Sequence, residues 1–102
     1  MLSRLTDPQA VKDAMLEFKS LGRDDFIASV AFGYAYSDFI DDGKRLYDAK
    51  AIAGRALEIQ YPQLAPLPHN AFHSGEPLRK KLKSLEFKVV SLHPPADLRS
   101  TP

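Results

Sequence analysis

Residues 34–57, YAYSDFIDDGKRLYDAKAIAGRAL, decide the fold that we predict for this chain. The β-prone run that begins at Tyr34 leads into Asp42-Gly43, which would supply the two positive-φ residues of a two-residue hairpin turn. The chain returns as a second strand through Tyr47, and Asp48 is placed to cap a helix. That helix carries one apolar stripe at helical spacing: Ala49, Ile52, Ala53, Ala56 and Leu57. The stretch therefore predicts a β-hairpin, residues 34–47, that runs directly into an amphipathic helix.

Two helices are expected before this unit. Asp7-Pro8 has the cap-then-proline order of a helix start, and Gly22 is placed to end that helix. A second, short helix is expected from Arg23, with acidic residues in its first turn.

After the unit, residues 61–72 carry three prolines within residues 62–68, which predicts a stiff, largely extended loop pinned to the core by Leu64, Leu67 and Phe72. A further helix is expected from the Ser74-Gly75-Glu76-Pro77 start to about residue 85, and residues 86–92 favour a third strand. We therefore predict an α+β fold, with about four helices around a small antiparallel sheet. We expect one domain, residues 1–92, followed by a flexible tail, residues 93–102.

Composition narrows the function. The chain has 102 residues and no cysteine, which excludes a disulfide framework, a thiolate zinc site and a cysteine nucleophile. The first residues lack the apolar core of a signal peptide, and no apolar run approaches the roughly 20 residues of a membrane span. We expect a cytoplasmic protein with no membrane partner.

The net charge of +1 conceals an asymmetry. Residues 1–43 contain four Lys/Arg and eight Asp/Glu, whereas residues 44–102 contain ten Lys/Arg and five Asp/Glu. Concentrated positive charge attracts polyanions even when the whole molecule is nearly neutral. The carboxyl-terminal half is therefore the candidate surface for nucleic acid.

Catalytic patterns are weak in comparison. His69 and His73 are four residues apart, but they follow prolines, and a structural zinc site needs four ligands. No nucleophile elbow and no glycine-rich phosphate loop of a standard pattern occurs. The acid pairs at Asp24 and Asp41 suit a helix start and a turn. We expect no catalytic activity, no metal and no cofactor.

The basic residues form the stronger pattern. Cations of the hairpin and the following helix accompany four cations within residues 79–83, and the helix start offers a hydroxyl and backbone amides for phosphate oxygens. The candidate contacts to double-stranded DNA are Lys44, Arg45, Tyr47, Lys50, His73, Ser74, Gly75, Arg79, Lys80 and Lys83. The alternative for the helix cations is a solvated surface, and sequence alone does not say whether these groups converge on one face.

The run DGKRLYDAKAIAG, residues 42–54, resembles the Tyr-Asp-x-Lys-Ala-Ile-Ala-Gly signature of the amino-terminal head domain of McrA-like, modification-dependent HNH endonucleases. The LGRDDF run at residues 21–26 and Phe32-Gly33 are similar to the same family. Downstream, the family has a Phe-Ser-Gly-Gly element and a Leu-Gly-Phe-x-Val strand. Here His73 is inserted, Glu76 replaces the second glycine, and Glu86 replaces the glycine before the strand.

The resemblance implies a non-catalytic, DNA-associated accessory domain of a restriction or phage-defence system that acts on modified or foreign DNA. It makes Tyr47, Lys50, Ser74 and Gly75 the preferred contacts and places the nuclease domain elsewhere. The signature also has a purely structural interpretation, in which Tyr47 is core and Gly54 is a site of close helix packing. A different class of function, a protein-interaction or oligomerisation module that docks a nuclease domain or subunit, stays open.

Overall fold

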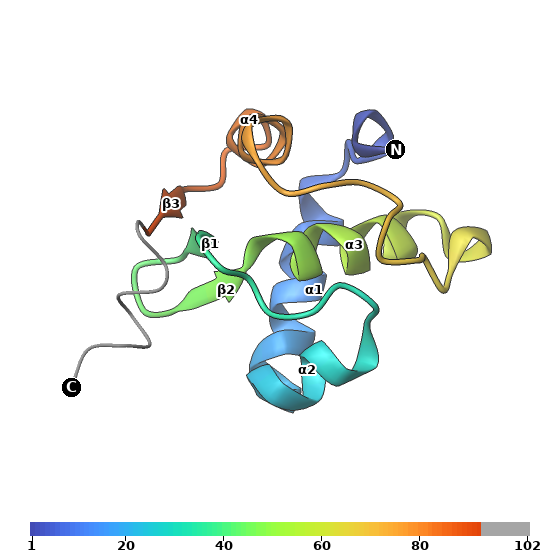
Figure 1. Cartoon of the computed structure of the whole chain (residues 1–102), viewed down its shortest axis with the longest axis horizontal. Helices are drawn as coiled ribbons and strands as arrows, with labels where there is room; N and C mark the ends of the chain where they lie inside the picture. Colours follow the sequence, from blue (N-terminus) through green and yellow to red (C-terminus); the bar gives the residue numbers. More distant parts are fainter. Residues whose placement is uncertain (93–102) are drawn as a thin grey trace.

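The computed structural model describes residues 1–92 (Figure 1). In chain order the elements, with η for a 3-10 helix, are η1 (Leu2–Arg4), α1 (Pro8–Leu21), α2 (Arg23–Ser29), β1 (Asp38–Asp41), β2 (Leu46–Asp48), α3 (Ala49–Gln60), η2 (Pro62–Leu64), α4 (Glu76–Ser84) and β3 (Val89–Ser91). This arrangement confirms the predicted α+β class. Residues 93–102, predicted as a tail, lie outside the described residues.

The two longest helices, α1 and α3, form the centre of the core. Figure 1 shows α3 crossing α1, with the sheet at one end of α3, α2 on one side and α4 on the other. The predicted apolar stripe of α3 is confirmed, since Ala49, Ile52, Ala53, Ala56 and Leu57 are all fully buried. Ala51 and Gly54, on other sides of α3, are buried as well. The helix is therefore enclosed by its neighbours rather than half exposed.

The start and the end of α1 follow the sequence signals. The Asp7 side chain accepts a hydrogen bond from Gln9 N at 2.9 Å, and Pro8 occupies the first helical position, where its missing N–H breaks no helical bond. Gly22 ends the helix at a φ of 88°, a conformation that glycine adopts without steric cost. Gln60 at the end of α3 accepts the amides of Thr6 and Asp7, so the two helices are joined at this end.

The sheet is antiparallel with the order β2-β1-β3. The strands are shorter than predicted: β1 begins at Asp38 rather than at residue 34, and β3 covers three residues of the expected seven. The prediction for the turn was wrong in detail. Asp42 N bonds Arg45 O, and of the two residues expected to have a positive φ only Gly43 has one, at 89°. The Asp42 carboxylate instead accepts the amides of Lys44 and Arg45 and so holds the turn closed.

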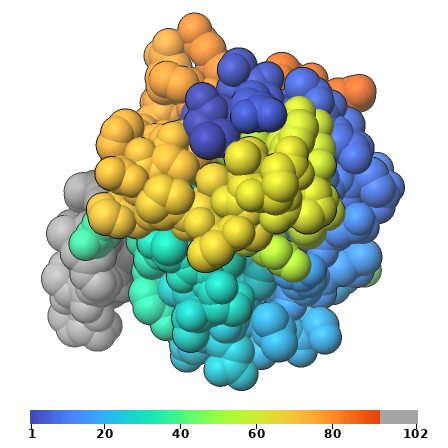
Figure 2. Space-filling view, turned by 90° about the vertical axis from the view of Figure 1, so that its right-hand side faces the viewer, coloured from blue at the N-terminus to red at the C-terminus, as the bar shows by residue number. Residues whose placement is uncertain are grey.

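The loop after α3 is pinned to the core as expected. Leu67 and Phe72 are buried and Leu64 is half-buried, although the loop opens with the short helix η2 rather than with extended chain. Figure 2 shows this loop against the amino-terminal residues, where the Tyr61 hydroxyl donates to the carbonyl of Arg4 at 2.9 Å. The loop therefore lies along the surface as a fixed segment.

The end of α4 contains one departure from the family pattern, Glu86. Glu86 N bonds Lys83 O at 2.9 Å and Phe87 N bonds Leu82 O at 3.0 Å, which are the two bonds of a Schellman motif. The residue between helix and strand must then take a left-handed conformation, and Glu86 has a φ of 73°. It occupies the position at which the resembling family carries glycine.

No helix in the described part of the chain is both long and apolar enough to cross a membrane.

Candidate nucleic-acid interface

A hollow of about 280 Å³ opens beside the amino-terminal end of α3. One wall is the segment between α2 and β1, and the other side is formed by the first turn of α3 and the residues before α4. Figure 2 shows the residues before α4 lying next to the segment between α2 and β1. The residues that line the hollow are Phe32, Gly33, Tyr34, Ala35, Tyr36, Ser37, Asp38, Lys50 and Ser74.

Lys50 is the cation of the hollow. Its Nζ donates to the carbonyl of His69 at 3.0 Å and lies 5.6 Å and 5.8 Å from the ring centroids of Phe32 and Phe72. Within residues 1–92 no carboxylate pairs with this ammonium group. The charge is therefore held in a defined place and is not neutralised by a described neighbour.

Ser74 comes from a distant part of the chain. It precedes α4 and lines the hollow together with the segment that carries Ser37. The hydroxyls of Ser37 and Ser74 make no hydrogen bond to any residue that the structure describes. Gly75, with a φ of 118°, is the N-cap residue of α4, and no side chain caps that helix.

The wall that carries Tyr34 is fixed by an ion pair in which Asp48 is buried and Arg23 is partly exposed. Asp48, 1% exposed, accepts Arg23 Nε at 2.9 Å, Arg23 Nη2 at 2.8 Å and the amide of Ala35 at 2.9 Å. The hydrogen bond to Asp48 raises the pKa of Arg23. Asp48 stands at the N-cap position of α3 but makes no capping bond, so the prediction that it caps the helix was wrong.

Tyr34 itself is held on two sides. The guanidinium of Arg23 lies 4.8 Å from its ring centroid, and its hydroxyl donates to Asp24 at 2.6 Å. The hydrogen bond to Asp24 raises the pKa of Tyr34. The ring is nonetheless 51% exposed, so a rigid aromatic surface faces solvent at the rim of the hollow.

One acid lines the hollow, and its charge is offset by an arginine. Asp38 is 5% exposed and binds Arg79 Nη1, at 3.3 Å to Oδ1 and 3.2 Å to Oδ2. Its Oδ1 also accepts the Ser91 hydroxyl at 2.9 Å. Asp38 thus joins β1, β3 and α4, and Arg79 of the predicted DNA-contact set reaches the hollow through this carboxylate.

Tyr47 corrects the predicted set. It is fully buried, packs 5.0 Å from the ring of Phe18, and its hydroxyl donates to Asp42 at 2.6 Å. Burial and this hydrogen bond raise the pKa of Tyr47 to about 12. Tyr47 is a core residue and offers no surface to DNA, which is the structural interpretation of the signature.

The remaining predicted contacts are spread over three places. Lys44 and Arg45 lie on the hairpin turn, at the other end of β2 from Lys50. His73 is exposed but does not line the hollow. On α4, exposed Lys80 pairs with Glu76 at 3.0 Å, whereas exposed Lys83 has no ion pair within the described residues.

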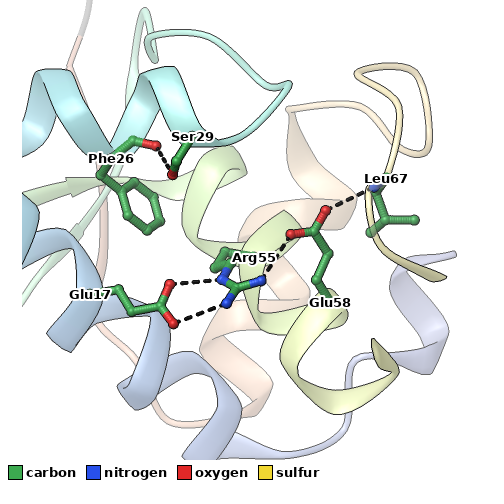
Figure 3. A network of polar contacts seen from close by, with 6 residues as sticks. All are labelled: Glu17, Phe26, Ser29, Arg55, Glu58 and Leu67. Atoms are coloured by element: carbon green, nitrogen blue, oxygen red, sulfur yellow. Dashed lines mark hydrogen bonds and ion pairs between the residues drawn. The ribbon is translucent and has the colours of Figure 1, made fainter. Parts of the chain in front are cut away.

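Gly54 and Arg55 have structural roles. A Cβ on residue 54 would lie 2.6 Å from Cδ2 and Cζ of Phe32, so glycine is required for the ring to occupy its place beside the hollow. Figure 3 shows Arg55 between Glu17 of α1 and Glu58 of α3, with Nε 2.7 Å from Glu17 Oε1. Glu58 also accepts the amide of Leu67 at 2.8 Å. Arg55 is therefore no free cation of α3.

Sequence reasoning predicted Lys50 and Ser74 as contacts but missed Ser37 and Asp38, which line the same hollow. Ser37 and Asp38 carried no pattern that separates them from ordinary residues of a strand, and Tyr34 and Tyr36 were assigned to that strand. Two dipeptides that the family resemblance singled out, Phe32-Gly33 and Ser74-Gly75, do contribute residues to the hollow. Among residues 1–92, no three His, Asp or Glu side chains are placed to hold a metal ion.

Comparison with known proteins identifies the family of this chain. The family model of the ScoMcrA-like N-terminal head domain matches residues 3–91, which associates the chain with a McrA-type restriction system. Neither the curated proteins nor the solved structures gave a match. The match covers nearly the whole chain, including both sides of the hollow and all four α-helices. The chain belongs to the family of ScoMcrA-like N-terminal head domains.

Proposed function

We propose that this domain is a non-catalytic accessory module that binds double-stranded DNA, modified or foreign, for a nuclease domain or subunit of a restriction system. The observation that carries the proposal is the placement of Lys50. This ammonium group, without a carboxylate partner in the described part of the chain, lies at a hollow shared with Ser74, a residue 24 positions further along the chain.

The cations of α4 extend this surface. Arg79 approaches the hollow through Asp38, and Lys83 follows it by four residues, so both lie on one side of the helix. Lys80 is partly offset by its pair with Glu76. Phosphate contacts by lysine and arginine supply most of the affinity of sequence-independent DNA binding. The strongest contributions are therefore expected from Lys50 and Lys83.

The test is fluorescence anisotropy of a labelled 20-bp duplex with the full chain, at several salt concentrations from 50 to 200 mM. Each phosphate contact contributes about −0.9 to the slope of log K against log salt. We expect Lys50→Ala and Lys83→Ala each to weaken binding and to reduce the slope by about 1, with a smaller effect for Lys80→Ala. Thermal unfolding of each variant should still show a cooperative transition well above the assay temperature, which excludes loss of fold as the cause.

Lys12→Ala is the matched control. Lys12 is an exposed lysine of α1, has no ion pair within residues 1–92 and does not line the hollow. Its substitution removes the same charge from a different element, so it should leave the slope unchanged. Salt-insensitive binding, or an equal loss for Lys12→Ala and Lys50→Ala, would remove the proposal.

One observation favours a protein-interaction module as the second candidate. Leu16 and Leu21 of α1 are 57% and 49% exposed, which leaves apolar surface on the acidic half of the chain. This candidate would be supported by a concentration-dependent dimer in mass measurements on a chain that does not bind the duplex. A monomer at all concentrations that binds DNA would exclude oligomerisation as the role of this surface.

A further inference from the structure

The shape of the hollow also limits which part of a DNA molecule it can accept. Duplex grooves are read by protruding elements such as a helix or a two-stranded ribbon. A concave site is complementary to a group that projects from DNA, and a base projects only when it leaves the stack. The volume of about 280 Å³ lies just below the roughly 300–1,000 Å³ of pockets for drug-sized ligands. It suits a single ring system with its linking groups.

From this geometry we propose that the hollow receives one unstacked nucleotide of a DNA strand, with its base against Tyr34 and its phosphate beside Lys50. The inference rests on the proposed DNA-binding function and assigns the part of the ligand that this site takes.

The aromatic wall is prepared for stacking. Tyr34 is fixed by Arg23 on its ring and by Asp24 on its hydroxyl, and Arg23 is itself anchored by its ion pair with Asp48. Binding therefore orders little that is not already ordered, which is the condition under which a contact contributes most to affinity. Stacking of a base on an aromatic side chain is tolerant of base identity.

The polar groups fit the rest of a nucleotide. Lys50 supplies a point charge for a phosphate oxygen, and the hydroxyls of Ser37 and Ser74 can donate to or accept from a base edge. The one carboxylate in the wall, Asp38, is already bound by Arg79 and by Ser91, so its charge is offset at the point where the anion would approach. A polyanion would meet the ammonium group of Lys50 beside an aromatic rim.

The experiment compares three duplexes of one sequence by fluorescence anisotropy with the full chain. The first is fully paired, the second carries one bulged adenosine, and the third carries a bulged abasic site at the same place. The last two share the bend and the extra phosphate and differ only in the base. Because stacking of one base on an aromatic side chain changes affinity roughly 5- to 150-fold, we expect the adenosine bulge to bind tighter than the abasic bulge within this range.

Tyr34→Leu should reduce that ratio to about 1, while the affinity for the fully paired duplex stays within about 2-fold. Since Tyr34→Leu also removes the contacts to Arg23 and Asp24, thermal unfolding is measured alongside. Ser74→Leu is the second variant. Ser74 is exposed and its side chain makes no hydrogen bond to a described residue, so this variant fills the hollow without touching the Asp48 ion pair. It should also reduce the ratio of adenosine-bulge to abasic-bulge affinity to about 1.

Lys44→Ala, on the hairpin turn, is the control and should weaken both bulged duplexes equally. Equal binding of the adenosine and abasic bulges would overturn the inference while leaving the proposed function intact. A ratio that survives in Ser74→Leu would overturn it too. Absence of salt-dependent binding to the fully paired duplex would instead overturn the proposed function.

Discussion

Replacement of Gly54 by alanine should destabilise the domain, although alanine is the better helix former. In an open helix interior the substitution would stabilise by about 1 kcal/mol. Here the added Cβ would lie 2.6 Å from two ring atoms of Phe32 and nearer still to Cε2. That ring is 92% buried and packs 5.2 Å from the ring of Phe72, so the free space left to it is the hollow that it lines.

The magnitude follows from the two opposing terms. Expelling a buried phenylalanine ring costs up to about 3–5 kcal/mol. Subtracting the gain in helix propensity of about 1 kcal/mol gives a net loss of about 2–4 kcal/mol in the free energy of unfolding for Gly54→Ala. Smaller shifts of the ring would bring the loss toward the 1–3 kcal/mol that is typical of overpacking.

Urea denaturation followed by circular dichroism measures this loss, and a second background fixes its cause. In Phe32→Ala the ring is absent, so Gly54→Ala should stabilise by about 1 kcal/mol, with the opposite sign to its effect in the unchanged chain. If Gly54→Ala stabilises the unchanged chain, or has the same effect in both backgrounds, the contact between α3 and Phe32 is not the reason for glycine at this position.

Other predictions concern the turn at the end of α4 and the hairpin. Glu86→Gly should stabilise the domain by about 1 kcal/mol. A side chain at a φ of 73° costs roughly 1–2 kcal/mol, and the greater conformational freedom of glycine in the unfolded chain offsets only part of this gain. We expect a rise of roughly 4–8 °C in Tm, and no rise would contradict the prediction. The hydroxyl of Tyr47, followed by the amides of Lys44 and Arg45, lowers the pKa of Asp42 from 3.8 to about 2. Because the folded-state pKa is the lower one, this contribution to stability is present above about pH 4 and is lost as the pH falls toward 2. Tyr47→Phe should therefore reduce the loss of stability between pH 4 and 2, measured by urea midpoints. It should leave DNA affinity unchanged, since residue 47 is buried. A fall in DNA affinity in a variant that is still folded would contradict the assignment of Tyr47 to the core.

Local signals predicted the helices well because they act within a few residues. Asp7-Pro8 and Gly22 bound α1 where expected, and the apolar spacing of α3 identified its buried stripe. These features depend on backbone hydrogen bonds and steric limits that the residues themselves impose. The short strands were less well predicted, since pairing in a three-stranded sheet depends on partners distant in the chain.

By itself the sequence determined the α+β class, the order of the elements and the resemblance to the head-domain family. Only the tertiary structure decided what the polar residues do. Asp48 looks like a cap, yet its carboxylate binds Arg23, 25 residues away, and Tyr47 looks like a surface tyrosine until the core closes over it. The physical reason is reach: a side chain that ends in a charged or hydroxyl group bonds whatever partner the fold brings within about 3 Å, and spacing along the chain does not specify that partner.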